Sequence, residues 1–356
     1  MKIKKIMPQN WNTYNSLSII DKGKLLNKTP HTLIAQQFKI EDLKKLSLLA
    51  TKIRQISKSK EGCCFLKTIL EDKRAMLYFA QPSSRTYLSF NAACQTLGLN
   101  TMDVRDSKTS SEIKGESPED TVRTFSSYVD LVIMRHPLMG FSEKIAWMLS
   151  NTNREIPVIN AGSGADQHPT QALLDIYTLE RSFDQNGGIN GKTILFSGDL
   201  KRGRTVRSLS WLLSLYKNVE IYFSAPKELQ ISDDILNLLD KTKTKYSVVN
   251  KLDQYICFAD AIYMTRLQDE WDKEEEKNNF NIESFQLNID HLNLMKENAI
   301  IMHPLPRRNE ISTDLDNSPQ AMYWRQMRNG MWIRAALILS TFNREELLDD
   351  WREKYA

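Results

Sequence analysis

Seven short apolar runs, separated by longer amphipathic stretches, constrain the fold of this chain more than any other feature. Each run has four or five residues and includes β-branched or aromatic side chains, which is typical of strands buried in a parallel sheet. The runs occupy residues 75–79, 131–134, 156–159, 193–196, 219–223, 261–264 and 299–302. The stretches between them predict helices over 87–97, 118–128, 171–181 and 205–216. This alternation predicts an α/β fold in which helices flank parallel strands.

A glycine-rich segment near the middle of the chain divides this pattern into two halves. It reads SFDQNGGINGK over residues 182–192, and clustered glycines are typical of loops between ordered elements. At roughly 150 residues per domain, a chain of 356 residues is long enough for two domains. We therefore predict two Rossmann-like domains, each a parallel sheet flanked by helices, over residues 32–181 and 182–328.

The two ends of the chain fall outside these domains. Residues 329–356 contain the last apolar-periodic stretch, 331–348, and no strand follows it. We therefore expect a C-terminal helix that packs back on the first domain. Residues 1–31 are basic but lack the unbroken apolar core of a signal peptide, and a transit peptide would favour arginine over lysine. We expect either a mobile N-terminal extension or an arm that contacts another subunit.

The charge balance, the cysteines and the hydropathy exclude several classes of protein. The 48 Lys and Arg residues exceed the 44 Asp and Glu residues by only four and are scattered, so we expect no nucleic-acid binding. No CxxC pair occurs among Cys63, Cys64, Cys94 and Cys257, so we expect reduced thiols and no zinc site. No run approaches the ~18 apolar residues of a membrane span. We therefore expect a cytoplasmic protein that does not bind membranes.

Cationic or hydrogen-bonding side chains follow six of the predicted strands. Open α/β sheets bind ligands at the carboxyl ends of their strands, where loops and helix N-termini meet. The segments after these strands are 80–86, 135–137, 161–171, 198–205, 265–268 and 303–307, and each contains arginine or histidine. This placement predicts a site for an anionic ligand.

The first of these segments begins a predicted helix with Ser83, Ser84, Arg85 and Thr86. Unpaired backbone N–H groups at a helix start bind phosphate oxygens, and three hydroxyls with one guanidinium strengthen such a site. The alternative is an ordinary N-cap beside a surface arginine. The chain contains neither GxxxxGK[ST] nor GxGxxG, which excludes the nucleotide-binding loops that carry those motifs.

Other strand-end residues suit carbonyl, amide or carboxylate groups. His168 and Gln171, with Arg135 from another strand end, can hydrogen-bond a carbonyl oxygen and an amide nitrogen. The alternative for His168 is a satisfied buried histidine beside a capped helix. Arg204 and Arg266 follow strands of the second half, and each is suited to a bidentate clamp on a carboxylate. The alternative for each is a surface salt bridge.

Seven motifs together resemble the aspartate/ornithine carbamoyltransferase family, and its aspartate branch closely, over nearly the whole chain after about residue 32. They are FAQPSSRTYLSF (79–90), KGE (114–116), MRHP (134–137), NAGSGADQHPTQALLD (160–175), GDLKRGRTVRS (198–208), RLQ (266–268) and HPLPR (303–307). The resemblance implies transfer of the carbamoyl group of carbamoyl phosphate to the α-amine of L-aspartate, a step of pyrimidine biosynthesis. It implies no metal and no organic cofactor.

The resemblance also implies a role for each matching residue. The residues expected to hold the phosphate are Ser83, Ser84, Arg85 and Thr86, and those expected to polarise the carbamoyl carbonyl are Thr86, Arg135 and His168. The NH2 group would be held by Gln171 and the backbone carbonyls of Pro304 and Leu305. The acceptor's carboxylates would be held by Arg204, Arg266 and Gln268.

Two further residues are expected to come from a neighbouring subunit. Ser110 and Lys114 lie in the segment that the family donates to the adjacent active site, and Lys114 would reach both substrates. The resemblance therefore implies a homotrimer with shared active sites and closure of the two domains. Some relatives bind regulatory chains or dihydroorotase, and the sequence leaves both partners open. The residues expected to act on the reacting groups are Arg85, Thr86, Lys114, Arg135 and His168.

The sequence departs from the family pattern at three places, and two alternatives stay open. Tyr87 replaces a common arginine, residues 112–113 (Glu-Ile) replace a more basic stretch, and the acidic segment 269–277 is longer than usual. One alternative is a carbamoyltransferase for ornithine, another amino acid or an amide, although ornithine-type members carry cysteine where Pro304 stands. The other is a non-catalytic scaffold, which would be expected to lose residues such as Arg85 or His168.

Overall fold

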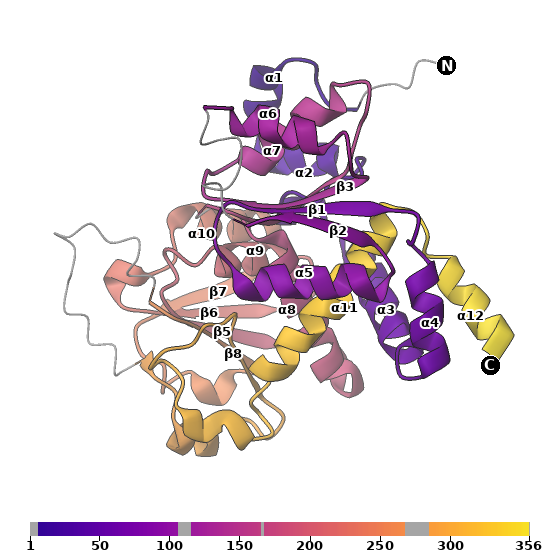
Figure 1. The fold of residues 1–356 in the computed structure, drawn as a ribbon. Coiled ribbons are helices and arrows are strands. Elements are labelled where there is room, and N and C mark those ends of the chain that lie inside the picture. Colours follow the sequence, from indigo (N-terminus) through magenta and orange to yellow (C-terminus); the bar gives the residue numbers. More distant parts are fainter. Residues whose placement is uncertain (1–5, 106–114, 165–166, 268–284, 356) are drawn as a thin grey trace. The chain divides into compact units, whose positions relative to one another are not determined.

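The chain forms two compact α/β units, each built around one parallel sheet (Figure 1). The structure, a computed structural model, describes residues 6–105, 115–164, 167–267 and 285–355, with side chains as far as residue 351. The first unit comprises residues 1–174 and 330–356, and the second unit comprises residues 175–329. The predicted α/β fold with two parallel sheets is confirmed.

Every pairing within these two sheets is parallel. The first sheet has the order β2-β1-β3-β4 and consists of β1 (Arg74–Phe79), β2 (Asn100–Val104), β3 (Leu131–His136) and β4 (Val158–Ser163). The second has the order β7-β6-β5-β8-β9 and consists of β5 (Thr193–Gly198), β6 (Glu220–Ser224), β7 (Lys245–Val249), β8 (Ala261–Thr265) and β9 (Ile300–Met302). The sequence did not predict β2 and β7, because these edge strands carry mostly exposed or half-buried side chains and so lack an apolar run.

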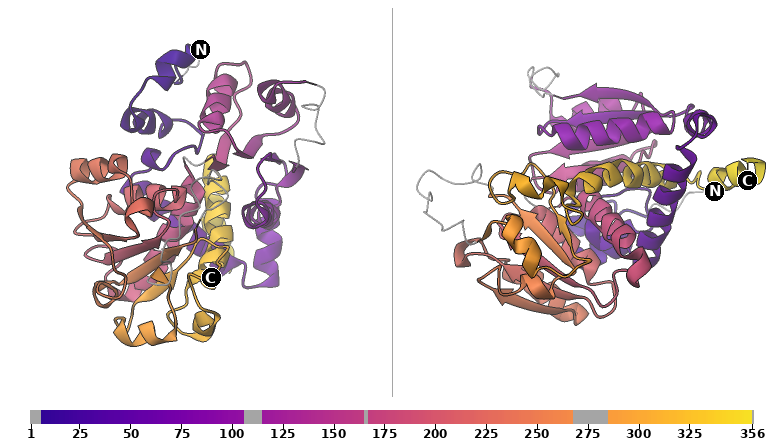
Figure 2. Two further views of the ribbon diagram at one scale, coloured as in Figure 1. Left: turned by 90° about the vertical axis from the view of Figure 1, so that its left-hand side faces the viewer. Right: turned by 90° about the horizontal axis from the view of Figure 1, so that it is seen from below.

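Helices cover both faces of the first sheet. They are α1 (Trp11–Asn15), α2 (Ile19–Leu26), α3 (Ile40–Ile56), α4 (Lys60–Thr68), α5 (Ser84–Thr96), α6 (Pro118–Phe125), α7 (Phe141–Ser150) and the 3₁₀ helix η1 (Ala35–Gln37). Figure 1 shows α1, α6 and α7 on one side of β1–β3 and α5 on the other, and Figure 2 shows α5 lying along the strands from below. Side chains alternate along β1: Met76 and Tyr78 join the core under α1, α2, α6 and α7, whereas Phe79 meets Tyr87 of α5 edge to face.

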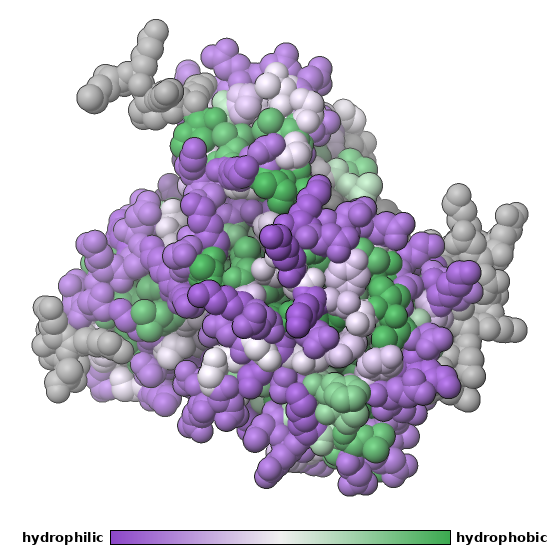
Figure 3. Space-filling model, turned by 180° about the vertical axis from the view of Figure 1, so that it is seen from behind, coloured by the Kyte–Doolittle hydropathy of each residue, from purple (hydrophilic) through white to green (hydrophobic). Residues whose placement is uncertain are grey.

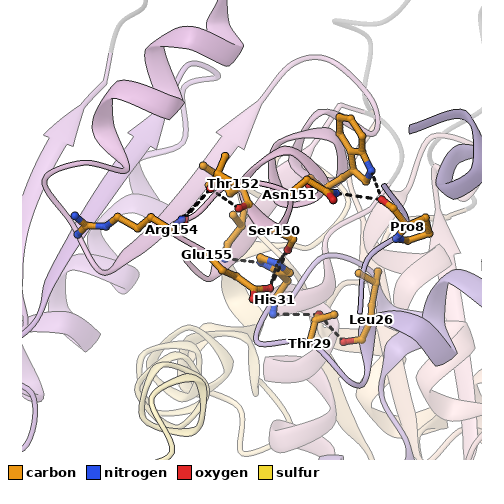
Figure 4. Close-up of polar contacts among 12 residues, drawn as sticks. Pro8, Leu26, Thr29, His31, Ser150, Asn151, Thr152, Arg154 and Glu155 are labelled. Atoms are coloured by element: carbon orange, nitrogen blue, oxygen red, sulfur yellow. Dashed lines mark hydrogen bonds and ion pairs between the residues drawn. The ribbon is translucent and has the colours of Figure 1, made fainter. Parts of the chain in front are cut away.

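The N-terminal segment is folded into the first unit, which corrects the expectation of a mobile extension for residues 6–31. Tyr14 is fully buried and its hydroxyl donates to Glu143 Oε2 at 2.6 Å. The Pro8 carbonyl accepts from Trp147 Nε1 at 2.7 Å, as Figure 4 shows together with the contacts of His31. The segment is therefore part of the core beside α7, and its expected role as an arm between subunits stays a prediction.

His31 anchors the end of this segment to the sheet. Its Nδ1 accepts a hydrogen bond from the Val158 backbone N–H at 3.0 Å, and its Nε2 lies 2.8 Å from Ser150 Oγ (Figure 4). Burial lowers the pKa of His31 to about 3, so the ring is neutral at pH 7. A neutral ring has one lone pair and one N–H, and both find partners here because Ser150 Oγ can accept.

The C-terminal segment packs back on the first unit, as predicted. It forms two helices, α11 (Tyr323–Thr341) and α12 (Leu347–Tyr355), instead of one continuous helix over 331–348. Asn343 lies between them with φ of +52°, a left-handed conformation that ends a helix. The Phe65 and Trp351 rings lie 5.1 Å apart, and Lys52 Nζ lies 2.6 Å from Asp349 Oδ1, so α12 contacts both α3 and α4.

The second unit has apolar side chains on both faces of its sheet. Its further helices are α9 (Arg204–Leu213), α10 (Asp233–Thr242), η4 (Asp184–Asn186), η5 (Lys227–Leu229), η6 (Ile256–Phe258), η10 (Ile289–Leu294) and η11 (Thr313–Asn317). Leu195 and Ile262 belong to one core cluster, while Phe196 on the opposite face stacks on Phe223 at 5.7 Å. α8 (Pro169–Phe183) begins in the first unit and ends in the second, and α11 begins in the second unit and ends in the first.

Hydrophilic and hydrophobic residues share the molecular surface (Figure 3). On the face shown in Figure 3, hydrophilic residues surround several separate hydrophobic areas. Among the described residues, no helix combines the length and the apolar character needed to cross a bilayer.

Candidate active site

The predicted phosphate loop lies at the start of α5. Ser83 is the N-cap residue, and Ser84, Arg85 and Thr86 form the first turn. Ser83 Oγ donates to Thr86 Oγ1 at 3.0 Å, while Ser84 and Arg85 are exposed. The backbone N–H groups of this turn have no intrahelical acceptors, so they can bind an anion together with the Arg85 guanidinium.

Arg135 and His168 converge on one glycine at the carboxyl edge of the same sheet. Arg135 belongs to β3, pairs in register with Phe79, and donates from Nη1 to the Ala161 carbonyl at 3.3 Å. Gly162 has a φ of +126°, and a Cβ placed on it would lie 2.4 Å from Arg135 Nη1 and 3.6 Å from His168 Cδ2. Only glycine therefore allows the guanidinium and the imidazole to occupy these positions. Both side chains are more than nine-tenths buried.

Two residues that the sequence did not single out hold this edge in place. Asn160 accepts from the Gly162 N–H at 2.8 Å and donates to the Leu33 carbonyl at 2.9 Å. Gln167 accepts from the Ala35 N–H through its side chain at 3.4 Å and from Ser163 N through its backbone carbonyl at 3.1 Å. A polar residue inside an otherwise apolar strand was the available signal for Asn160.

Gln171 lies in the first turn of α8, next to His168. Its backbone N–H donates to the His168 carbonyl at 3.0 Å, and its side chain is 6% exposed. His168 and Gln171 are thus held on one helix turn. His136, which follows Arg135 in β3, has a packing role instead. Its ring stacks on that of Phe141 at a centroid distance of 4.0 Å, and burial lowers the pKa of His136 to about 4. His136 is therefore a neutral packing residue, as its partners indicate.

Tyr87 departs from the family pattern and has an arginine as its partner. The guanidinium carbon of Arg105, the residue after β2, lies 4.3 Å from the centre of the Tyr87 ring. Burial is the main cause that raises the pKa of Tyr87, followed by the nearby Asp103, so the phenol is protonated. A cation is thereby held over the ring of residue 87, although residue 87 itself carries no charge.

In the second unit, the predicted acceptor residues lie at the carboxyl ends of two adjacent strands. Arg204 is the first residue of α9, after β5, and Arg266 directly follows β8, the neighbour of β5. Arg266 donates from Nη1 to the Leu267 carbonyl at 2.7 Å. Gly198 ends β5 so close to β8 that a Cβ on it would lie 2.0 Å from the Thr265 carbonyl oxygen. The two arginines therefore belong to one edge of the sheet.

A cavity of about 300 Å³ opens at this edge, lined by residues that include Gly198, Thr265, Leu267, Arg308 and Glu310. The loop between β5 and α9 is shaped by Asp199, a fully buried carboxylate whose Oδ1 accepts from the Arg202 N–H at 3.1 Å. The cavity lining includes one cation, Arg308, whereas the predicted acceptor residues Arg204 and Arg266 are not among the lining residues.

The HPLPR segment follows β9 and is held by its own histidine. His303 Nδ1 accepts from the Leu305 N–H at 2.8 Å, so Nε2 carries the proton and donates to Glu310 Oε1 at 2.8 Å. Burial lowers the pKa of His303. Burial also acts to raise the pKa of Glu310, but its hydrogen bonds from His303 and the Arg308 N–H outweigh this and lower it. A neutral imidazole therefore donates to a carboxylate.

The last residue of this segment is structural. Arg307 forms a two-pronged ion pair with Asp316, in which Nη2 lies 2.7 Å from Oδ2, and Tyr323 donates to the same carboxylate at 2.6 Å. The guanidinium holds the pKa of Asp316 below its usual range.

Some predicted site residues lie outside the described residues: Ser110, Lys114 and Gln268, together with the departures at 112–113 and 269–277. Among the described residues, no group of three or more His, Cys, Asp or Glu side chains is placed to hold a metal ion.

Comparisons with known proteins agree on one family. The model of the aspartate/ornithine carbamoyltransferase carbamoyl-P binding domain matches residues 30–181, and that of the Asp/Orn binding domain matches residues 190–341. The aspartate carbamoyltransferase catalytic subunit of Clostridium novyi (strain NT) is 39% identical over 301 residues, covering 85% of this chain and 94% of that protein. Aspartate carbamoyltransferase 1, chloroplastic, of Pisum sativum is 39% identical over 308 residues, covering 85% and 76%.

A solved structure gives the same result. Aspartate transcarbamoylase from Trypanosoma cruzi, in complex with carbamoyl phosphate and aspartate, superposes with a TM-score of 0.75 at 34% identity, covering 88% of this chain and 96% of that chain. The fold and the strand-end residues define a two-unit α/β protein with arginine-containing loops at the carboxyl edges of both sheets. The chain belongs to the aspartate/ornithine carbamoyltransferase family. The resemblance predicted from seven motifs is confirmed.

Proposed function

We propose that this chain transfers the carbamoyl group of carbamoyl phosphate to the α-amine of L-aspartate, giving N-carbamoyl-L-aspartate and phosphate for pyrimidine biosynthesis. The observation that carries the proposal is the convergence of Arg135 and His168 at Gly162, on the sheet edge that also carries the Ser83–Thr86 helix start. The relatives named above support aspartate as the acceptor, since they are aspartate carbamoyltransferases and one is solved with both substrates.

The donor would be held by three sets of groups. The start of α5, with Ser83, Ser84, Arg85 and Thr86, binds the phosphate. Thr86, Arg135 and His168 donate to the carbamoyl oxygen, and Gln171 with the carbonyls of Pro304 and Leu305 binds the NH2 group. We also propose residues 32–181 as the carbamoyl-phosphate domain and residues 182–328 as the aspartate domain. The two family-domain matches support this division.

The reaction then needs no protein nucleophile. The neutral α-amine of aspartate attacks the carbamoyl carbon and forms a C–N bond, while negative charge grows on the carbamoyl oxygen. Arg85, Arg135 and His168 stabilise that charge, and one such donor contributes about 3 kcal/mol to transition-state stabilisation. The C–O bond to phosphate breaks, and the leaving phosphate takes the proton that the amine loses. The protein's main task is to hold two anions side by side.

The acceptor would be held by Arg204 and Arg266, with Gln268, each guanidinium binding one carboxylate. Ser110 and Lys114 would reach this site from a neighbouring subunit. We therefore propose a homotrimer with shared sites, located in the cytoplasm.

Radiolabel transfer tests the proposal. Purified protein is incubated with [¹⁴C]carbamoyl phosphate and either aspartate, ornithine or another amine as sole acceptor, and the products are separated. We expect labelled N-carbamoyl-aspartate with aspartate, and loss of most product in Arg135→Ala. Product with another acceptor alone would overturn the choice of aspartate. No product with any acceptor, from folded protein, would indicate a non-catalytic homologue.

A further inference from the structure

A buried chain of hydrogen bonds runs from a carboxylate in α8 to the segment that contains Pro304 and Leu305, entirely within the second unit. Asp175 Oδ1 accepts from Gln326 Nε2 at 2.7 Å, and Gln326 Oε1 accepts from the His303 backbone N–H at 2.9 Å. Asp175, Gln326 and His303 are each fully buried. A second bond, from the Tyr263 hydroxyl to Asp175 Oδ2 at 2.8 Å, holds the carboxylate in place.

The Asp175 carboxylate determines the orientation of the Gln326 side-chain amide. Asp175 can only accept hydrogen bonds when ionised, so the NH2 end of the amide must face it. The carbonyl end then faces the His303 N–H, which donates to it at 2.9 Å. A reversed amide would place two acceptors together at one end and two donors together at the other, among fully buried groups. The orientation of Gln326 is therefore set by its two hydrogen-bond partners and not only by packing.

His303 in turn holds the backbone of Leu305 through its imidazole ring. Its Nδ1 accepts from the Leu305 N–H at 2.8 Å, and its Nε2–H donates to Glu310 at 2.8 Å. Leu305 has a φ of +53°, a left-handed conformation that a branched residue adopts only when its surroundings hold it there. The directions of the Pro304 and Leu305 carbonyls thus depend on two supports, His303–Glu310 on one side and Gln326–Asp175 on the other.

We propose that Gln326 is a positioning residue that aims the Pro304 and Leu305 carbonyls at the donor's NH2 group, and so sets the preference for carbamoyl phosphate over acyl phosphates. This inference rests on the proposed function. A carbonyl oxygen accepts a hydrogen bond from an amide NH2 but receives none from a methyl group, which leaves the acceptor unpaired. Sites built around such a hydrogen bond reject the analogue that lacks it far more strongly than an apolar pocket does.

Acetyl phosphate is the matching probe, because a methyl group replaces the amino group and the phosphate is unchanged. The experiment measures kcat/KM for carbamoyl phosphate at saturating aspartate, and the inhibition constants of acetyl phosphate and inorganic phosphate, in wild type and Gln326→Met. Methionine fills a similar volume without either hydrogen bond. We expect kcat/KM for carbamoyl phosphate to fall about tenfold or more, on the scale of one lost recognition hydrogen bond. Both inhibition constants should stay within about twofold, since neither ligand uses these carbonyls.

Asn329→Ala is the matched control, because Asn329 lies three residues further along α11 and is also a buried amide. It donates to Thr178 Oγ1 at 3.0 Å and has no bond to the HPLPR segment, so it should leave the preference within about twofold of wild type. If Gln326→Met does not fold, Gln326→Asn keeps the amide but shortens its reach, and the same selective loss is expected. An unchanged preference in a folded Gln326 variant would overturn the inference. Equal weakening of the binding of carbamoyl phosphate, acetyl phosphate and inorganic phosphate would also overturn it, because that result indicates general disruption of the site. Absence of carbamoyl-aspartate formation by wild type would instead contradict the proposed function.

Discussion

The guanidinium of Arg105 lies over the ring of Tyr87, 4.3 Å from its centre, beside the helix turn that carries Arg85 and Thr86. Tyr87 stands where the resemblance predicts arginine, and Arg105, at the end of β2, places its cation over the Tyr87 ring. The ring is itself fixed by its edge-to-face contact with Phe79, at 5.5 Å.

Removing either member of this pair is expected to weaken donor binding. Arg105→Met removes the charge, and Tyr87→Leu removes the aromatic face that holds it. A surface cation–π contact contributes about 0.5–1 kcal/mol, so we expect KM for carbamoyl phosphate to rise roughly two- to fivefold with little change in kcat. Tyr87→Phe keeps the ring and is the control, expected to match wild type. A Tyr87→Leu variant with unchanged KM would show that the stack has no part in binding.

Substitution of Gly162 by alanine is expected to lower activity strongly, although Gly162 lies within a strand of the sheet. An alanine methyl group would meet Arg135 Nη1 at 2.4 Å, so the guanidinium must move away from the donor site. Loss of one oxyanion donor costs about 2.7–4 kcal/mol, and we therefore expect kcat for Gly162→Ala to fall about 10²–10³-fold. Gly140→Ala is the control: its φ of +68° is also unfavourable for alanine, but nothing lies within 4 Å of the added Cβ. Its kcat should stay near that of wild type, and equal losses in both variants would contradict a specific effect on Arg135.

Most of the fold could be predicted because buried strands need apolar runs. The runs at 75–79 and 193–196 became β1 and β5 almost residue for residue, whereas the exposed edge strand β7 has no such run. The N-terminal segment was misread because α1 and α2 have five and eight residues, which is too short for helical periodicity to show. Its docking depends on Tyr14 and on His31, whose partners lie more than a hundred residues away in the chain.

The candidate site, like the fold, could be predicted from the sequence only in part. Strand-end positions brought Arg135 and His168 together on one sheet edge, as the α/β pattern predicts. Their close approach depends on the φ of Gly162 and on the hydrogen bonds of Asn160, which follow from tertiary geometry. The same holds for Gln326, since no motif in the sequence links it to His303.

His31 is expected to make the first unit sensitive to acid. Burial lowers its folded-state pKa to about 3, against 6.5 for an exposed histidine, so the unfolded chain binds the extra proton between these values. Stability is then complete above about pH 6.5 and falls as the pH drops toward 3, by at most ~1.4 kcal/mol per pH unit for one proton. Chemical unfolding at pH 7, 6 and 5 measures this slope. His31→Gln cannot titrate and should show a shallower slope, whereas an unchanged slope would assign the acid sensitivity to other groups.

The acceptor arginines are expected to act on aspartate and not on carbamoyl phosphate. Arg204→Gln and Arg266→Gln each remove a cation from the carboxylate edge, and hydrogen bonds to a charged group contribute about 1.5–3 kcal/mol. We therefore expect kcat/KM for aspartate to fall at least tenfold, with the inhibition constant of inorganic phosphate unchanged. Arg207→Gln is the control on the same helix, because Arg207 forms a surface ion pair with Asp234. It should lie within about twofold of wild type, since surface ion pairs contribute little.

Subunit mixing tests whether active sites are shared. Arg85→Ala should lose about 3 kcal/mol of transition-state stabilisation, and Lys114→Ala should be comparably impaired, so each proposed homotrimer built from one variant alone should be nearly inactive. If one subunit supplies Arg85 and its neighbour supplies Lys114, co-expressed chains form some sites in which both residues are intact. In a random equal mixture this holds for about one site in four, because each neighbour is drawn independently. Selection by two different tags removes the trimers that contain a single kind of chain. Each remaining trimer then has one intact site out of three, so we expect the purified mixed trimers to recover about a third of wild-type activity. The double variant Arg85→Ala/Lys114→Ala mixed with either single variant is the control, because one of the two residues is then missing from every site. No recovery in the first mixture would place both residues in the same subunit's site.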